Sequence, residues 1–138
     1  LSGEVLYNKI EEVLPKDQYG WHLNPGHLCA DEEWLSSPVY PASTEKIKSG
    51  MLFQFDIIPS VPSYSGASCE GGIVLADECL RSAIQKEYPE MWSRMQARRR
   101  YLIEELGIEV SEEVLPTSNA TAYYRPFFLN KEAAFTAK

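Results

Sequence analysis

The stretch that decides the fold is residues 51–75, MLFQFDIIPSVPSYSGASCEGGIVL, where two segments of alternating side chains flank a loop. Alternation between two directions is typical of β-strands, so residues 51–58 and 67–75 are predicted to be strands. The link between them, residues 59–66, contains two prolines, three serines and a glycine. It predicts a hairpin loop rather than a linker between domains.

The alternation also assigns side chains to the two faces of this hairpin. In the first strand, Asp56 points away from the neighbouring aromatic and aliphatic side chains Phe53, Phe55 and Ile57. In the second strand, Glu70 alternates with Cys69 and Gly71. In an antiparallel pair of suitable register, Asp56 and Glu70 can therefore share one face.

The residues before the hairpin predict one helix and one extended segment. Ser2 can cap a helix over residues 3–14, which Pro15 ends. Residues 19–29 alternate in an extended pattern up to a Pro-Gly turn. Residues 30–50 contain two prolines and a polar stretch, and they are predicted to form a loop.

The residues after the hairpin predict two helices and a tail. Asp77 can cap a helix over residues 78–87, and Pro89 suits the first turn of another helix that runs to about Leu106. The apolar stripe of the second helix is interpreted as packing surface. From Ser111 onwards the chain forms a tail, expected to pack on the fold or on a partner through its aromatic side chains, Tyr123, Tyr124, Phe127 and Phe128.

Composition bounds the class of protein. The 138 residues fit one domain with a real core. A net charge of −7 argues against a nucleic-acid partner, and the basic run Arg98 to Arg100 is interpreted as a solvated helix face. Three cysteines without CxxC spacing argue for a reducing compartment, the cytoplasm. No apolar run approaches about 18 residues, so no membrane partner is expected, and the start at Leu1 suggests a piece of a longer protein.

One imidazole and two carboxylates form the candidate site: His27, Asp56 and Glu70. Each lies on or beside a β-type segment, and together they are a donor set for a hard or borderline divalent metal. Three ligands make only half of a two-metal centre, which needs further carboxylates to bridge the ions. The alternative is structural: a turn histidine bonded to the backbone, and two strand carboxylates that face solvent.

These segments resemble, in the same order, the second half of the pita-bread metallopeptidases, the family of methionine aminopeptidase, aminopeptidase P, prolidase and their relative creatinase. Residues 47–56, IKSGMLFQFD, and residues 69–75, CEGGIVL, resemble two ligand-bearing strands of that family. His27, in NPGH, falls where the family has its metal-binding histidine. The resemblance implies an α+β fold, half of a pita-bread, with a curved antiparallel sheet and outer helices. It covers residues 1–77, and residues 78–138 are expected to be a helical extension and C-terminal tail packed on it in a single domain.

The chain departs from the family pattern at three points. The two aspartate ligands of the family come from an earlier αβ half, which is absent here. Asp56 stands where the family has glutamate, which shifts a ligand oxygen by about one C–C bond length. The peptidase branch often has a second histidine shortly after the first, whereas residues 31–34 read DEEW; His22 lies upstream and could compensate.

The resemblance implies the C-terminal fragment of a metal-dependent C–N hydrolase, similar to Xaa-Pro aminopeptidase or prolidase, that acts on small peptides and is inactive alone. Divalent Mn, Co or Zn would be the cofactor of the parent protein. His27, Asp56 and Glu70 would hold it in part, and His27 and Glu70 would have catalytic roles.

Two alternatives stay open. One is a non-catalytic pita-bread binding scaffold, and the other is a metal-free creatinase-like amidinohydrolase in which His27 or His22 moves a proton on an amidino substrate. In either case, half a pita-bread leaves a sheet edge and a face uncovered. We therefore expect a homodimer, or association with the N-terminal half of the parent protein.

Overall fold

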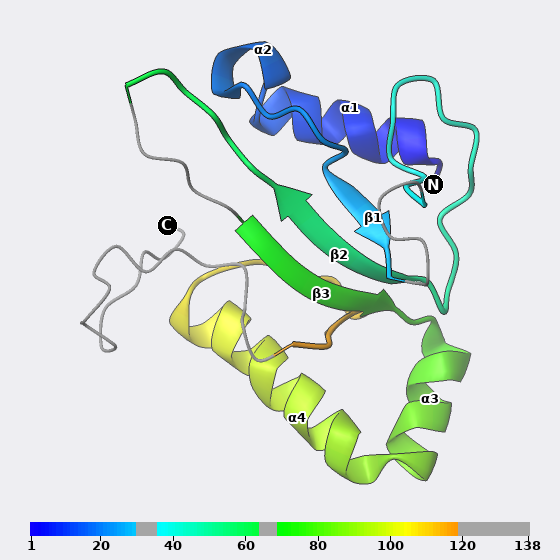
Figure 1. The fold of residues 1–138 in the computed structure, drawn as a ribbon. Helices are drawn as coiled ribbons and strands as arrows, with labels where there is room; N and C mark the ends of the chain where they lie inside the picture. The colour runs from blue at the N-terminus through cyan, green and yellow to red at the C-terminus, as the bar shows by residue number, and fades with distance from the viewer. Residues whose placement is uncertain (30–35, 64–68, 119–138) are drawn as a thin grey trace.

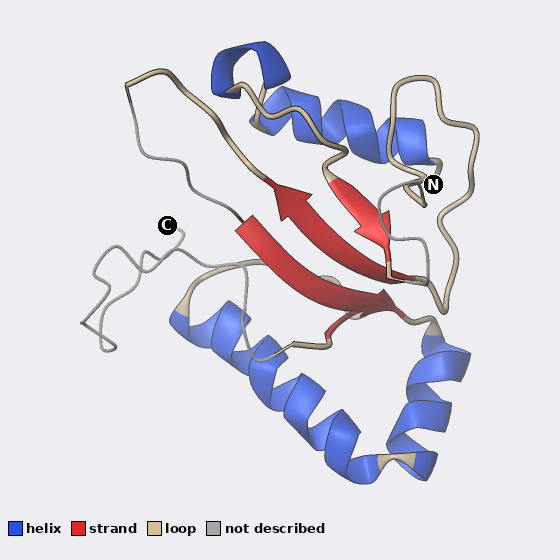
Figure 2. Cartoon of the chain, in the orientation of Figure 1, coloured by secondary structure: helices blue, strands red, loops and turns tan. Residues whose placement is uncertain are grey.

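The computed structural model describes residues 1–29, 36–63 and 69–118, which form a four-stranded antiparallel sheet with helices packed around it (Figures 1 and 2). The strands lie side by side in chain order. The expected α+β class is confirmed. The strands have the following bounds: β1 Gly26–Leu28, β2 Leu52–Ile57, β3 Cys69–Leu75 and β4 Val114–Pro116.

Strands β2 and β3 form the predicted hairpin. Phe53 lies opposite Ile73, and Asp56 lies opposite Glu70. Residues directly opposed in an antiparallel pair place their side chains on the same face. The prediction that these two carboxylates share a face is therefore confirmed. Residues 64–66 of the predicted loop lie outside the described residues.

The pleat of the strands divides the sheet into two faces, which we name by the side chains of β2. The apolar face carries aromatic and aliphatic side chains, Phe53, Phe55 and Ile73. The polar face carries side chains from three adjacent strands, His27, Gln54, Asp56 and Glu70.

Helix α1, Gly3–Val13, lies along the sheet near the N-terminus (Figure 1). Ser2 occupies its N-cap position, but the predicted side-chain cap is wrong because the Ser2 side chain makes no capping hydrogen bond. A loop replaces it: the N–H of Gly3 donates to the carbonyl oxygen of Glu45 at 2.9 Å. A Cβ on Gly3 would come within 1.7 Å of the Pro38 carbonyl oxygen, so the first turn packs directly on this loop.

The segment predicted to be extended, residues 19–29, is mostly not a strand. It begins at the end of a short helix, α2, Lys16–Tyr19, and only Gly26 opens β1. Trp21 lies between them and is 1% exposed. Its indole N–H donates to the carbonyl oxygen of Leu14, the residue that follows α1, at 2.9 Å. The alternation of this segment therefore reflects burial of an aromatic side chain in a loop.

Helices α3 and α4 pack at the β4 side of the sheet (Figure 1). Helix α3, Glu78–Glu87, begins as predicted, with the Asp77 carboxylate accepting a hydrogen bond from the backbone N–H of its third residue. Helix α4, Pro89–Arg100, continues into a π-helical turn, η1, Tyr101–Glu105. The buried core between these helices and the sheet consists of Ala76, Ile84, Met95 and Leu115.

Arg99 fixes the return of the chain to the sheet. It is 8% exposed, and its guanidinium donates to the backbone carbonyl oxygens of Val110, Ser111 and Val114. Burial lowers the pKa of Arg99, and the carboxylate of Glu112 opposes that shift. The interpretation of this basic run as a solvated face is therefore wrong for Arg99, which holds the segment leading into β4 against α4.

Candidate functional site

His27 is the buried polar residue of the polar face. Strand β1 places it opposite Gln54, and it is 6% exposed. Its Nδ1 lies 3.1 Å from the carbonyl oxygen of Leu28. A carbonyl can only accept, so the contact assigns a proton to Nδ1. The neutral ring then keeps a lone pair on Nε2, the atom nearer to Asp56.

Asp56 is the neighbour of this imidazole. Its Oδ2 lies 3.9 Å from Nε2 of His27, which is an ion-pair separation but longer than a hydrogen bond. The carboxylate is 18% exposed, and its Oδ1 is buried without a hydrogen-bond partner among the described residues. A buried acceptor left unpaired costs about 1–3 kcal/mol. The pair of His27 and Asp56 thus has no hydrogen-bond donor between its two groups, and either a proton on Nε2 or a bound cation would give the carboxylate a partner.

Glu70 lies beside this pair on the next strand. It is directly opposite Asp56 and is exposed. The side-chain amide of Gln54 donates to one oxygen of Glu70 at 3.4 Å. Sequence reasoning gave Gln54 no role, although the period of two already placed it on the same side of its strand as Asp56. Its amide restricts the orientation of the Glu70 carboxylate.

The three candidate residues have the ligand atoms that a divalent cation needs, but their positions do not form a complete metal site. A metal-binding histidine commonly donates its other ring N–H to a carbonyl, as Nδ1 of His27 can. Oδ1 of Asp56, which has no hydrogen-bond partner among the described residues, is a further atom that can coordinate a metal. Within the described part of the chain, however, no three His, Cys, Asp or Glu side chains are grouped so as to hold a metal ion. The described geometry therefore does not group the three residues as a metal site, and the half-site expected from the sequence stays a prediction.

The other residues singled out from the sequence do not enlarge this site. His22 is exposed, Cys79 is an exposed free thiol, and Cys29 is half-buried. Residues 31–34 and the tail aromatics beyond Ser118 lie outside the described residues.

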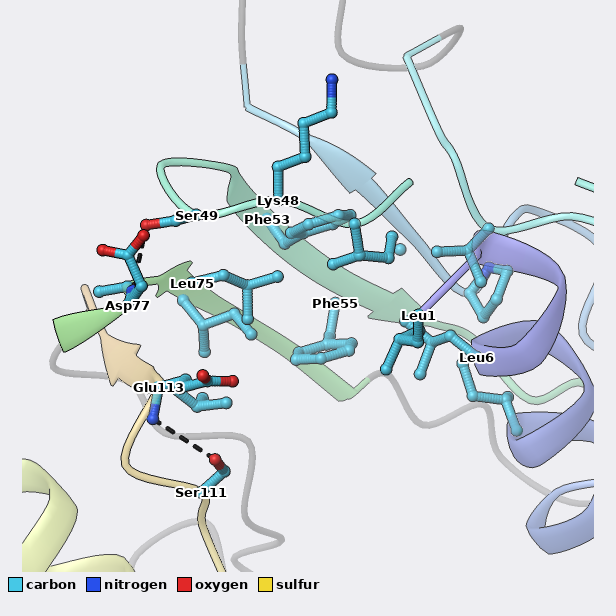
Figure 3. A pocket seen from close by; sticks show the side chains of 18 residues that line it. Leu1, Leu6, Lys48, Ser49, Phe53, Phe55, Leu75, Asp77, Ser111 and Glu113 are labelled. Carbon is cyan, nitrogen blue, oxygen red and sulfur yellow. Dashed lines mark hydrogen bonds between the residues drawn. The ribbon is translucent and has the colours of Figure 1, made fainter. Parts of the chain in front are cut away.

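A hollow of about 490 Å³ lies over the apolar face (Figure 3). By the pleat of the strands, this is the side of the sheet opposite to the candidate site. Helix α1 contributes Leu6 and Ile10 to its wall, and Phe53 and Phe55 form part of its floor. None of the three candidate site residues lines it. An apolar hollow of this kind suits packing by another chain segment rather than acid–base chemistry.

No protein-family model, curated protein or solved structure matches the chain. Among the described residues, no helix has the length and apolar character needed to cross a membrane.

Proposed function

We propose that the chain is the C-terminal half of a metal-dependent C–N hydrolase of the pita-bread type, similar to Xaa-Pro aminopeptidase or prolidase, and inactive alone. One observation carries the proposal: three adjacent antiparallel strands contribute His27, Asp56 and Glu70 to a single face. The order, a histidine followed by two carboxylates, is the one that the resemblance implies. The buried, unpaired oxygen of Asp56 supports a role other than stability.

In this proposal each residue has its own task. When bound, divalent Mn, Co or Zn supplies an activated water and polarises the scissile carbonyl. His27 offers Nε2 as a neutral ligand because Nδ1 is held by the Leu28 carbonyl oxygen. Asp56 offers its carboxylate beside that nitrogen. Glu70, also a ligand, is accessible enough to carry a proton to the leaving nitrogen, and Gln54 steadies its carboxylate.

Binding of Mn²⁺ to the full 138-residue chain, followed by electron paramagnetic resonance, tests the ligand set. We expect weak but saturable binding that His27→Ala and Asp56→Asn each reduce by at least about tenfold. His22→Ala is the matched control, because His22 is exposed and has no place in the ligand set. Equal binding by all four proteins would contradict the assignment.

Hydrolysis of dipeptides tests the second half of the proposal. The isolated chain should show little or no turnover with Mn²⁺ or Co²⁺, because a bridged pair of ions needs carboxylates that these three residues do not supply. Robust turnover abolished by His27→Ala would show that the site is complete in itself.

The pairing of His27 with Asp56 also favours a second candidate. A buried imidazole beside a carboxylate is an arrangement for general acid–base catalysis without metal, as in an amidinohydrolase-like enzyme. Cleavage of a guanidino or amidino compound in the presence of a chelator, lost in His27→Ala, would favour this candidate. If the wild-type chain neither binds metal nor turns over any of these substrates, a non-catalytic binding scaffold is favoured. The hydrogen bond from Gln54 to Glu70 suits such a scaffold equally well.

We also propose that the chain associates with a second copy or with the N-terminal half of its parent in the cytoplasm. The hollow over the apolar face supports this, because Phe53 and Phe55 border space that a further chain could fill. Sedimentation equilibrium of the isolated chain should give a mass above 15.6 kDa. A single species of 15.6 kDa would exclude self-association.

A further inference from the structure

A hollow of about 200 Å³ lies where the end of β4 meets helix α4, at the edge of the sheet opposite to β1. Two arginines of α4, Arg94 and Arg98, line it together with Thr117 and Ser118, the residues that follow β4. We propose that this hollow binds an oxyanion, namely a carboxylate joined to a small apolar group. The proposal does not depend on the function proposed above.

The first argument is the charge of the two arginines. They are four residues apart on a helix, so both side chains project from the same side. Neither guanidinium forms a hydrogen bond or an ion pair with any other described residue. Two like charges at this spacing repel each other and weaken a helix, and a bound anion removes that repulsion. In a chain of net charge −7, an unneutralised pair of guanidinium groups is a local exception.

Arg99, on the same turn of the helix, shows what an arginine looks like when the fold itself uses it. Its donors are directed at three backbone carbonyl oxygens. The planar forks of Arg94 and Arg98 have no such acceptors in the described part of the chain, and a guanidinium matches both oxygens of a carboxylate.

The second argument is the position of the Thr117 hydroxyl. The N–H of Thr117 donates to the carbonyl oxygen of Gly72 at 2.9 Å, which fixes Thr117 beside β3. Its Oγ1 lies 2.5 Å from the point where a Cβ on Gly72 would be. The missing side chain at Gly72 thus gives the hydroxyl room over the sheet, where it can donate to an oxygen of the ligand.

The third argument concerns the rest of the wall. Met91, Met95 and Pro116 also line the hollow. The thioether side chains are flexible and apolar, so they adapt to the body of a ligand whose charged end is bound by the arginines. The volume exceeds that of a bare inorganic ion, which favours a carboxylate with an attached apolar group.

Titration of the isotopically labelled full chain with N-acetyl-leucine, followed by NMR, tests the proposal. We expect saturable shifts of the Thr117 and Ser118 amides and of the Arg94 and Arg98 side-chain N–H signals. Affinity should fall by about tenfold or more when both arginines are replaced, Arg94→Gln with Arg98→Gln. Arg100→Gln is the matched control, because Arg100 lies on the same helix and is exposed. The same spectra show whether each variant is folded.

Two further ligands separate charge from apolar contact. N-acetyl-leucinamide has the same apolar body without the charge, and it should cause no saturable shift at these residues. Inorganic phosphate should bind more weakly than N-acetyl-leucine, and equal binding would overturn the apolar part of the proposal. Absence of saturable shifts at millimolar N-acetyl-leucine, or equal shifts in the double variant, would overturn the site itself.

Discussion

Asp56 and Arg99 are both charged residues withdrawn from solvent, and they have opposite surroundings. Arg99 is 8% exposed and donates to three carbonyl oxygens. The Asp56 side chain is 18% exposed and has a buried oxygen without a partner among the described residues. It lies 3.9 Å from an imidazole nitrogen that is itself an acceptor when neutral. The fold thus supplies acceptors for the guanidinium of Arg99, whereas the described residues supply no donor for one carboxylate oxygen of Asp56.

The difference separates stability from function. A buried polar group with all its partners stabilises the arrangement around it, whereas one without partners costs free energy that the fold must recover elsewhere. Such a cost is expected at a site that receives a proton, a cation or a ligand. The comparison therefore assigns Arg99 to the architecture of the β4 side and Asp56 to the candidate site.

The largest effect should come from Arg99→Met. The methionine keeps the length of the stem but removes the guanidinium donors from the carbonyl oxygens of Val110, Ser111 and Val114. The carbonyl oxygen of Ser111 keeps another donor, the N–H of Val114. We expect the free energy of unfolding to fall by about 2–4 kcal/mol, measured by urea denaturation. Arg100→Met, at an exposed position, should change it by less than about 0.5 kcal/mol. A similar small change in both variants would show that the Arg99 contacts are not structural.

Asp56→Asn should behave in the opposite way. It removes an unsatisfied buried charge while keeping the side-chain shape, so the free energy of unfolding should stay the same or rise by up to about 1 kcal/mol. In the same experiment with Mn²⁺, the wild-type chain should gain stability and the variant should not, because only binding to the folded state stabilises it. A loss of stability comparable to that of Arg99→Met would end the distinction between the two residues.

The same contrast explains what the sequence could predict of the fold. Strands β2 and β3 were predictable because a period of two persists through both of them and a segment rich in proline and serine separates them in the sequence. Helix α3 was predictable from Asp77, whose cap is local. Strand β4 was not predictable, because three residues are too few to show a period. Its place also depends on Arg99, which donates to carbonyl oxygens 11 to 15 residues later in the chain.

The candidate site was predictable to the same degree. That Asp56 and Glu70 share a face follows from the hairpin alone. The approach of His27 to Asp56 does not, because the register of β1 against β2 is set across the long loop between them. The unpaired oxygen of Asp56 is invisible in sequence, since it depends on which donors the surrounding chain fails to supply.

The smallest effect concerns a pair that is intermediate between these two cases. The hydroxyl of Tyr7, which is half-buried on α1, donates to a carboxylate oxygen of Glu11 at 2.8 Å. Burial, with a further contribution from this hydrogen bond, raises the pKa of Tyr7 from 10.0 to about 12. Between pH 10 and 12 the folded chain therefore keeps a proton that the unfolded chain releases. The stability associated with this proton is fully present below pH 10 and is lost as the pH rises through the folded pKa.

Tyr7→Phe isolates this contribution. At neutral pH the variant should lose about 1 kcal/mol or less, the net value of one hydrogen bond. As the pH rises from 10 to 12, the difference in the free energy of unfolding between wild type and variant should shrink, because only the wild type has the proton to lose. Urea denaturation at a series of alkaline pH values measures that difference directly. If the difference stays constant over this range, folding does not raise the pKa of Tyr7, and the contribution of its contact with Glu11 does not depend on this proton.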